Sequence, residues 1–131
     1  MGSWGVGSFE NDGACDWVYE LEKVKNLGLI EQAIGRANSQ EYVDCNIGEE
    51  AVAACEVLAA LRGRPGQKLP ESLTTWATQN PHELSANLLE QAQLALRRID
   101  SRDSELQEVW GETGLFKDWQ AAIEDLHQRL T

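Results

Sequence analysis

Side chains that could bind a cation through oxygen lie close together near the start of the chain. They are Asn11, Asp12 and Asp16. Gly13 could occupy the sixth position of a calcium-binding EF-hand loop, where a sharp turn needs glycine. That register puts Ser8 at position one and Tyr19 at position twelve, where the loop needs an acidic ligand and a bidentate glutamate. An EF-hand is therefore excluded, and we expect Asn11 or Asp12 to cap a helix, with Asp16 near its positive end.

A second group of carboxylates, Asp44, Glu49 and Glu50, has the residue types used in acid–base catalysis. Adjacent residues on a helix point in different directions, so Glu49 and Glu50 would not face one substrate. Glu49 also follows Asn46 by three residues, which is the spacing of a capping box. We expect it to cap a helix instead of doing chemistry.

The histidines and cysteines form no recognisable catalytic or metal-binding motif. His82 is expected in the first turn of a helix, where the dipole disfavours protonation, and His127 in a last turn, where it favours a cation. The three cysteines, Cys15, Cys45 and Cys55, are odd in number and show no C-x-x-C. No H-E-x-x-H, nucleophile elbow or P-loop is present. We therefore expect no catalytic residue, metal site or cofactor.

Residues 1–11 form a segment rich in glycine and aromatic side chains that leads into the first helix. Glycines allow backbone angles that other residues resist, while Trp4 and Phe9 offer large apolar area. We expect an irregular arm whose rings fasten it to the core, followed by Trp17 inside the core. If the protein has a site near this arm, its candidate residues are Trp4, Gly5, Gly7, Phe9, Asn11, Asp12, Asp16 and Trp17.

Apolar residues recur at spacings of three and four through most of the chain, and no segment alternates convincingly with period two. The pattern predicts an all-α bundle of six or seven helices in a single domain over 1–131. The number depends on whether Asn26-Leu27-Gly28 is a turn or a kink. The expected N-caps are Asn46 for the third helix, Asn80 for the fifth and Ser104 for the sixth. Pro81 is expected at the first position of the fifth helix. The helices are expected near 14–24, 29–39, 46–62, 70–77, 81–99, 104–111 and 115–130.

The composition makes nucleic acids and anionic membranes poor partners. Eleven basic residues stand against 22 acidic ones, a formal net charge of -11, and such a surface repels phosphate groups. One stretch, 61–80, carries Arg62, Arg64 and Lys68 against Glu71 alone and could dock an acidic partner. The chain shows no signal-peptide pattern and no apolar run of about 18 residues, so we expect a cytoplasmic protein.

The N-terminal pattern W-G-x-G-x-F-E-N-D-x-A-x-D-W over 4–17 identifies a family. It is followed by Glu50-Ala51, by L-A-A-L-R-G-R-P over 58–65 and by Leu69-Pro70. Together these resemble the mainly bacterial family called domain of unknown function 4259, over essentially the whole chain. The resemblance implies a small cytosolic bacterial protein and carries no established activity. Ser3 and Val6 depart from the family pattern, and Val6 leaves the arm without an imidazole.

Three hypotheses about function follow. The first is a non-enzymatic domain that binds a protein partner, for example an immunity-type protein or inhibitor that covers a basic toxin or nuclease. The second is a small-molecule-binding or metal-binding domain, including a hydrolytic one, with its site where the arm meets the helices. The third is a structural subunit of a homo-oligomer, although the sequence does not specify an oligomeric state.

Overall fold

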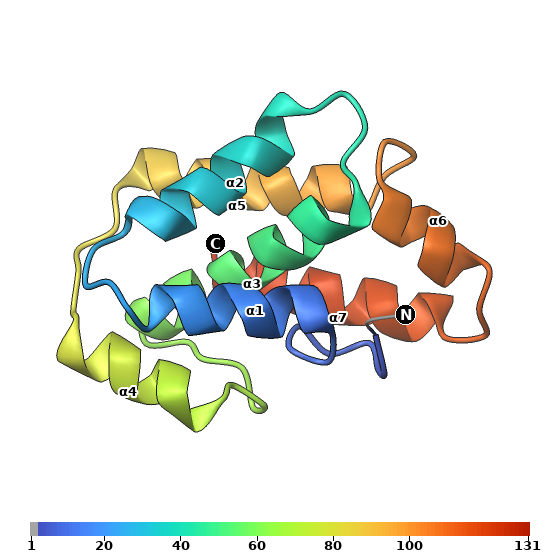
Figure 1. Cartoon of the computed structure of the whole chain (residues 1–131). Coiled ribbons are helices and arrows are strands. Elements are labelled where there is room, and N and C mark those ends of the chain that lie inside the picture. Colours follow the sequence, from blue (N-terminus) through green and yellow to red (C-terminus); the bar gives the residue numbers. More distant parts are fainter. Residues whose placement is uncertain (1–2) are drawn as a thin grey trace.

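The computed structural model describes residues 3–131 and confirms the all-α prediction, with seven helices in the described part of the chain (Figure 1). The helices are α1 (Asp12–Leu21), α2 (Gly28–Ser39), α3 (Cys45–Leu61), α4 (Glu71–Gln79), α5 (Ala86–Ile99), α6 (Glu105–Gly111) and α7 (Phe116–Arg129). Over residues 3–131, none of these helices has the length and apolar run needed to cross a membrane.

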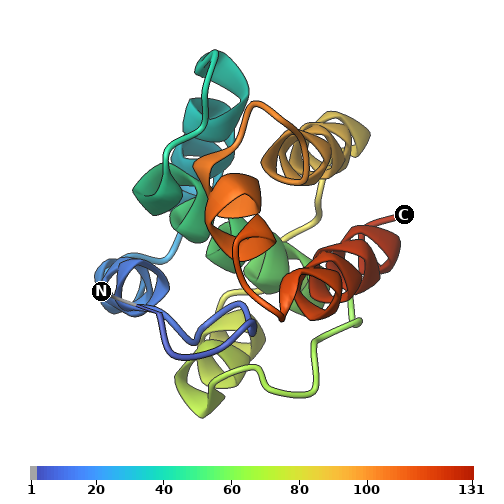
Figure 2. The ribbon, with the colours of Figure 1, turned by 90° about the vertical axis from the view of Figure 1, so that its right-hand side faces the viewer.

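Helix α3 is the centre of the fold. It contacts each of the other six helices, and Figure 2 shows it surrounded by them. Ten of its 17 residues are buried, most of them alanine, valine or another small side chain. Small side chains let neighbouring helices approach from several directions, which explains why this alanine-rich run is buried on more than one side.

Two predicted N-caps are confirmed. The Asn11 side chain accepts a hydrogen bond from the backbone N–H of Ala14 at 2.7 Å and begins α1. Ser104 accepts one from the N–H of Gln107 at 3.4 Å and begins α6. The break near 26–28 separates two helices and is not a kink: residues 22–27 lie outside any helix, and Gly28 begins α2.

The predicted N-cap of α3 at Asn46 is wrong. Asp44 takes that position and accepts a hydrogen bond from the N–H of Ile47 at 2.9 Å. Glu105 of α6 reaches across and accepts from the N–H of Cys45 at 2.7 Å. The N-cap therefore lies at Asp44, two residues before the expected Asn46, and α3 starts at Cys45. Glu49 has no capping role.

The prediction that α5 starts at Asn80-Pro81 is also wrong, because Asn80 closes the helix before it. The side-chain amide and the backbone N–H of Asn80 each donate a hydrogen bond of 2.9 Å to the carbonyl of Trp76. The His82 ring stacks on Trp76 with centroids 6.5 Å apart, so His82 is not in a first helical turn. These contacts hold 80–84 outside any helix, and Ser85 caps α5 instead.

Candidate functional site

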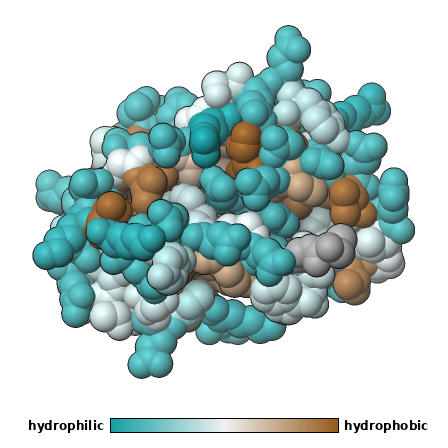
Figure 3. All heavy atoms as spheres, in the orientation of Figure 1, coloured by the Kyte–Doolittle hydropathy of each residue, from teal (hydrophilic) through white to brown (hydrophobic). Residues whose placement is uncertain are grey.

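A cavity of about 750 Å³ opens between the arm and the first turns of α1, α3 and α6. We call it the acidic cleft and define it by two tryptophans and four carboxylates: Trp4, Trp110, Asp12, Asp16, Glu49 and Glu105. Aliphatic side chains of α6 and the segment after it complete the wall. In Figure 3 most of the visible face is hydrophilic, and hydrophobic residues reach the surface only in small separate spots.

Glu49 is the most unusual group in the acidic cleft. Its side chain is half-buried, and its one hydrogen-bond partner among residues 3–131 is the Ser3 hydroxyl, 3.3 Å away. Burial raises the pKa of Glu49 above its ordinary value, and the negative charges of Asp12 and Glu105 raise it further, against the opposing effect of the Ser3 hydrogen bond. Within the described chain, a half-buried carboxylate therefore lacks a cation.

Gly13 makes the space that Glu49 occupies. A Cβ atom at Gly13 would lie 2.5 Å from Oε1 of Glu49 and 3.0 Å from the side-chain oxygen of Asn46. Any residue larger than glycine would push the carboxylate away from this position. The first turn of α1 thus allows Glu49 of α3 to reach the cleft wall.

Asp12 and Asp16 also face the cleft, from the first two turns of α1. Both are exposed, and neither has a hydrogen-bond or ion-pair partner within residues 3–131. Neither carboxylate therefore accepts a hydrogen bond from a backbone N–H group of the described residues. Their charges remain available to a ligand.

Three helix N-termini point their positive ends toward this region, yet the cleft stays negative. Each helix end is equivalent to about half a positive charge, or roughly +1.5 in total. The four carboxylates together represent up to four negative charges. Anions are therefore disfavoured in the cleft, and a cation is the ligand that its electrostatics suits.

The thiol of Cys45 lines the cleft but is not an activated nucleophile. Burial raises its pKa to about 12, and the charges of Glu105 and Glu49 add to the effect. The thiolate is the reactive form of cysteine. Cys45 therefore stays protonated at neutral pH.

The tryptophans divide between the core and the cleft. Trp17 is 6% exposed, which confirms its prediction as a core residue, and Trp119 is buried as well, at 3%. Trp110 is half-buried and packs against the core while bordering the cleft. Trp4 is 61% exposed, so the expectation that it fastens the arm is wrong. The same expectation is confirmed for Phe9, which is partly buried and packs against the core, and Val6 takes part in this contact as well.

Polar bonds within the arm fix its shape. Trp4 donates its backbone N–H to the carbonyl of Glu10 at 2.9 Å, which closes the arm on itself. The Glu10 carboxylate folds into this loop and accepts from the N–H of Gly7 at 3.0 Å. A Cβ at Gly5 or Gly7 would lie about 2.5 Å from that carboxylate. These glycines have no positive φ, so they provide room for Glu10 and not the unusual backbone angles expected from the sequence.

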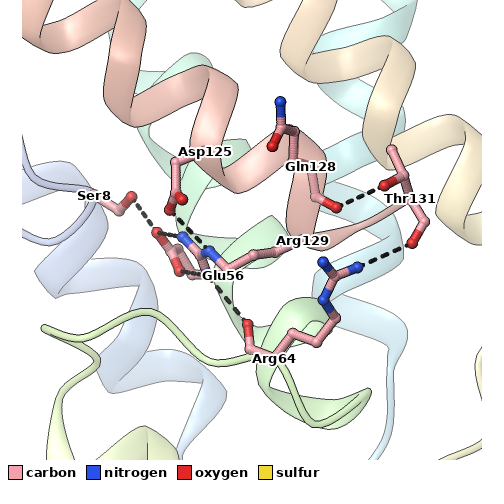
Figure 4. A network of polar contacts seen from close by, with 7 residues as sticks. All are labelled: Ser8, Glu56, Arg64, Asp125, Gln128, Arg129 and Thr131. Carbon is pink, nitrogen blue, oxygen red and sulfur yellow. Dashed lines mark hydrogen bonds and ion pairs between the residues drawn. The ribbon is translucent and has the colours of Figure 1, made fainter.

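A buried ion pair anchors the other end of the arm (Figure 4). The Ser8 hydroxyl donates to Glu56 at 2.6 Å, and Arg129 of α7 binds both oxygens of Glu56, at 2.9 and 3.2 Å. Arg129 also donates to Asp125 at 3.0 Å and to the carbonyl of Arg64 at 3.3 Å. Since Glu56 has both a cation and a hydroxyl as partners, its charge is fully compensated.

The remaining sequence candidates lie away from the acidic cleft. His127 sits in the last turn of α7, but burial lowers its pKa and the neighbouring charge of Arg97 lowers it further, so the expected preference for a cation there is wrong. Arg62 and Arg64 both donate to the carbonyl of Thr131. Across residues 3–131, no group of three histidine, cysteine or acidic side chains is arranged to hold a metal ion.

The structure brings together four of the eight sequence candidates, namely Trp4, Gly5, Asp12 and Asp16, at the acidic cleft. Asn11 and Trp17 are structural, and Gly7 and Phe9 border a second cavity on the other side of the arm. The sequence interpretation missed Glu49, Glu105, Cys45 and Trp110 as cleft residues. In the sequence, Glu49 has the residue type of a catalytic acid, but its spacing from Asn46 predicts a helix cap and therefore a structural role.

Comparison with curated proteins and with solved structures finds no match. A family model described as "Domain of unknown function (DUF4259)" matches residues 2–122. This match covers the arm, all of α1 to α6, and half of α7. It agrees with the resemblance carried by the motif at 4–17, and the chain belongs to this family.

Proposed function

We propose that this protein is a non-enzymatic binding domain whose acidic cleft receives a positively charged side chain of a protein partner. The observation that carries the proposal is Glu49, a half-buried carboxylate with a raised pKa whose one partner among residues 3–131 is a serine hydroxyl. A cation beside Glu49 would offset the cost of burying its charge, because an opposite charge within a few ångströms favours the ionised form. Asp12 and Asp16 at the rim add to the attraction.

The size and charge of the surface favour a protein as the source of this cation. A cavity of about 750 Å³ is in the range of sites that take a whole small ligand, so a long side chain and its neighbouring backbone would fit. The net charge of -11 would attract a basic partner over a distance and speed its association. An immunity-type or inhibitor protein that covers a basic toxin or nuclease is one concrete form of this proposal.

A cytoplasmic location is part of the same proposal. Cys15, Cys45 and Cys55 are all free thiols, and unpaired cysteines are usual in a reducing compartment. The proposal predicts that this protein meets its partner in the cytoplasm, before the partner is exported.

Binding can be tested with three capped peptides that differ only in charge. They are acetyl-Gly-Arg-Gly-Arg-Gly-amide and its lysine and glutamate counterparts, measured by isothermal titration calorimetry at low salt. At least one basic peptide should bind, and the glutamate peptide should not. Glu49→Gln should weaken the binding at least about fivefold, the order expected for losing one close charge.

The matched control is Glu31→Gln, which removes an equal charge from an exposed site in the first turn of α2. It should leave the affinity almost unchanged. If neither basic peptide binds, or if Glu31→Gln weakens binding as much as Glu49→Gln, the proposal is wrong. Binding of the glutamate peptide would contradict it as well.

A further inference from the structure

We propose that the acidic cleft selects arginine over lysine, and that Trp4 is the residue that determines this preference. The inference rests on the proposed function and names the side chain that the partner inserts. In the bound state, the indole of Trp4 covers the flat face of a guanidinium group while the carboxylates accept hydrogen bonds from its edge.

Trp4 is exposed where tryptophan is seldom left exposed. Tryptophan is among the most buried side chains on average, because its ring carries a large apolar area. Here 61% of it is accessible, although the backbone of Trp4 and the side chain before it are both hydrogen-bonded. Its own N–H is bonded to the carbonyl of Glu10, and the side chain of Ser3 is bonded to Glu49. The ring is thus held at the edge of the cleft without entering the core.

The position of Trp4 gives it access to a cation at Glu49. Ser3, its immediate neighbour, places a hydroxyl 3.3 Å from the Glu49 carboxylate. Trp4 and Glu49 border the same cavity, together with Asp12. A positive group held by these carboxylates therefore lies beside an aromatic ring that no core residue covers.

The chemistry of the two basic side chains explains the expected preference. A guanidinium group is planar and weakly hydrated, so it stacks on an aromatic face and still donates hydrogen bonds within its plane. The lysine ammonium is a compact, strongly hydrated charge that gains less from the ring. Carboxylates on α1, α3 and α6 approach the cleft from separate directions, which suits a donor with five N–H groups better than one with three.

Nuclear magnetic resonance can show whether Trp4 meets the peptide. The indole Nε1–H signals would be followed during titration with the arginine peptide and assigned by comparison with Trp4→Phe. The Trp4 signal should shift. Trp76 is an internal control, because its Nε1–H is bonded to the carbonyl of Val24 at 2.8 Å, away from the cleft, and its signal should not move.

Affinity measurements then separate the two proposals. The unsubstituted protein should bind the arginine peptide about three- to tenfold more tightly than the lysine peptide, the range expected for stacking of a cation on an indole. Trp4→Leu should bring the ratio close to one, mainly by weakening the arginine peptide, and Trp4→Phe should keep an intermediate ratio. Neither change should unfold the protein, because the ring is exposed.

The possible failures are distinct. If both basic peptides bind equally, or lysine binds better, and Glu49→Gln weakens both, the cleft binds cations but the selection by Trp4 is wrong. If arginine is preferred but Trp4→Leu leaves the ratio unchanged, the role of Trp4 is likewise wrong. If neither peptide binds, the proposed function fails and this inference fails with it.

Discussion

Glu49 and Glu56 lie seven residues apart on α3, and each accepts a hydrogen bond from a serine of the arm. Seven residues are about two helical turns, so both carboxylates lie on the face of α3 that the arm follows. Their surroundings differ most in the charge beside them. Glu56 is paired with Arg129, whereas Glu49 has no cation among the described residues. Glu56 therefore anchors the arm, whereas Glu49 is the carboxylate for which we propose an external cation.

Ser8→Ala should destabilise the protein more than Ser3→Ala. The hydroxyl of Ser8 bonds to a buried, charged carboxylate at 2.6 Å, and such bonds contribute about 1.5–3 kcal/mol. The bond from Ser3 is longer, 3.3 Å, and reaches a half-buried group, so its loss should cost about 0.5 kcal/mol. Urea unfolding followed by circular dichroism measures both. Equal losses would mean that the Ser8 end is not the stronger anchor.

Arg129→Met should be among the most destabilising single substitutions. The side chains of Arg129 and Glu56 are 15% and 9% exposed, and removal of one partner from a buried pair costs about 3–5 kcal/mol because a buried charge is left alone. Asp125→Asn is the matched control, since this carboxylate also bonds to Arg129 but is 70% exposed. Its cost should stay below about 1 kcal/mol. Chemical unfolding of both variants tests the difference.

The helical fold could be predicted because local signals agree with the final packing. Apolar spacing predicted six or seven helices, of which the structure has seven over residues 3–131, and Asn11 and Ser104 act as the caps that their residue types predict. The errors arose where a contact from another element decided the outcome. Glu105 of α6 supports the start of α3 at Cys45, and Trp76 of α4 holds Asn80 and His82 outside α5. No spacing within a single helix contains that information.

The acidic cleft could be predicted only in part for the same reason. Asp12 and Asp16 lie within the N-terminal motif, and their closeness as carboxylates is visible from the sequence. Glu49 and Glu105 are 56 residues apart in the chain, and only the packing of α6 beside α3 brings them to one cavity. The space that Gly13 leaves for Glu49 depends on a side chain from α3, so no local pattern around Gly13 contains it.

Gly13→Ala should reduce peptide binding without reducing stability. The new Cβ would lie 2.5 Å from Oε1 of Glu49, so this flexible carboxylate must rotate away from its place in the cleft. Alanine favours helix by up to about 1 kcal/mol over glycine, which offsets the local crowding. The expected result is an unfolding free energy equal to or above that of the unsubstituted protein, with a several-fold weaker affinity for the basic peptides.

Gly35→Ala provides the control for this substitution. It makes the same change within α2, where a Cβ would meet nothing within 4 Å. It should raise the unfolding free energy by about 1 kcal/mol and leave the affinity unchanged. A loss of affinity in Gly35→Ala equal to that in Gly13→Ala would show that the effect does not come from Glu49.

Glu49→Gln should stabilise the free protein at neutral pH while weakening peptide binding. The pKa of Glu49 is raised in the folded state, by burial first and then by Asp12 and Glu105. Between the ordinary glutamate pKa and this raised value, the folded protein binds more protons than the unfolded chain, so ionised Glu49 destabilises the fold at higher pH. Glutamine has the shape of the neutral form and avoids that cost. The stabilisation should be full above the raised pKa, decrease as the pH falls through that pKa, and vanish below the ordinary glutamate pKa of about 4.3, where the carboxyl is protonated in both states.

Thermal unfolding of Glu49→Gln across pH 4–7, beside Glu31→Gln, measures this difference. A lower stability of Glu49→Gln at pH 7 would show that the Ser3 hydrogen bond outweighs the cost of burial, and it would remove the main support for a cation at this position. The expected pattern, higher stability together with weaker binding, is the one produced when a residue is kept for a ligand and not for the fold. Addition of the basic peptide should then raise the melting temperature of the unsubstituted protein more than that of Glu49→Gln, because only the former gains a partner for its carboxylate.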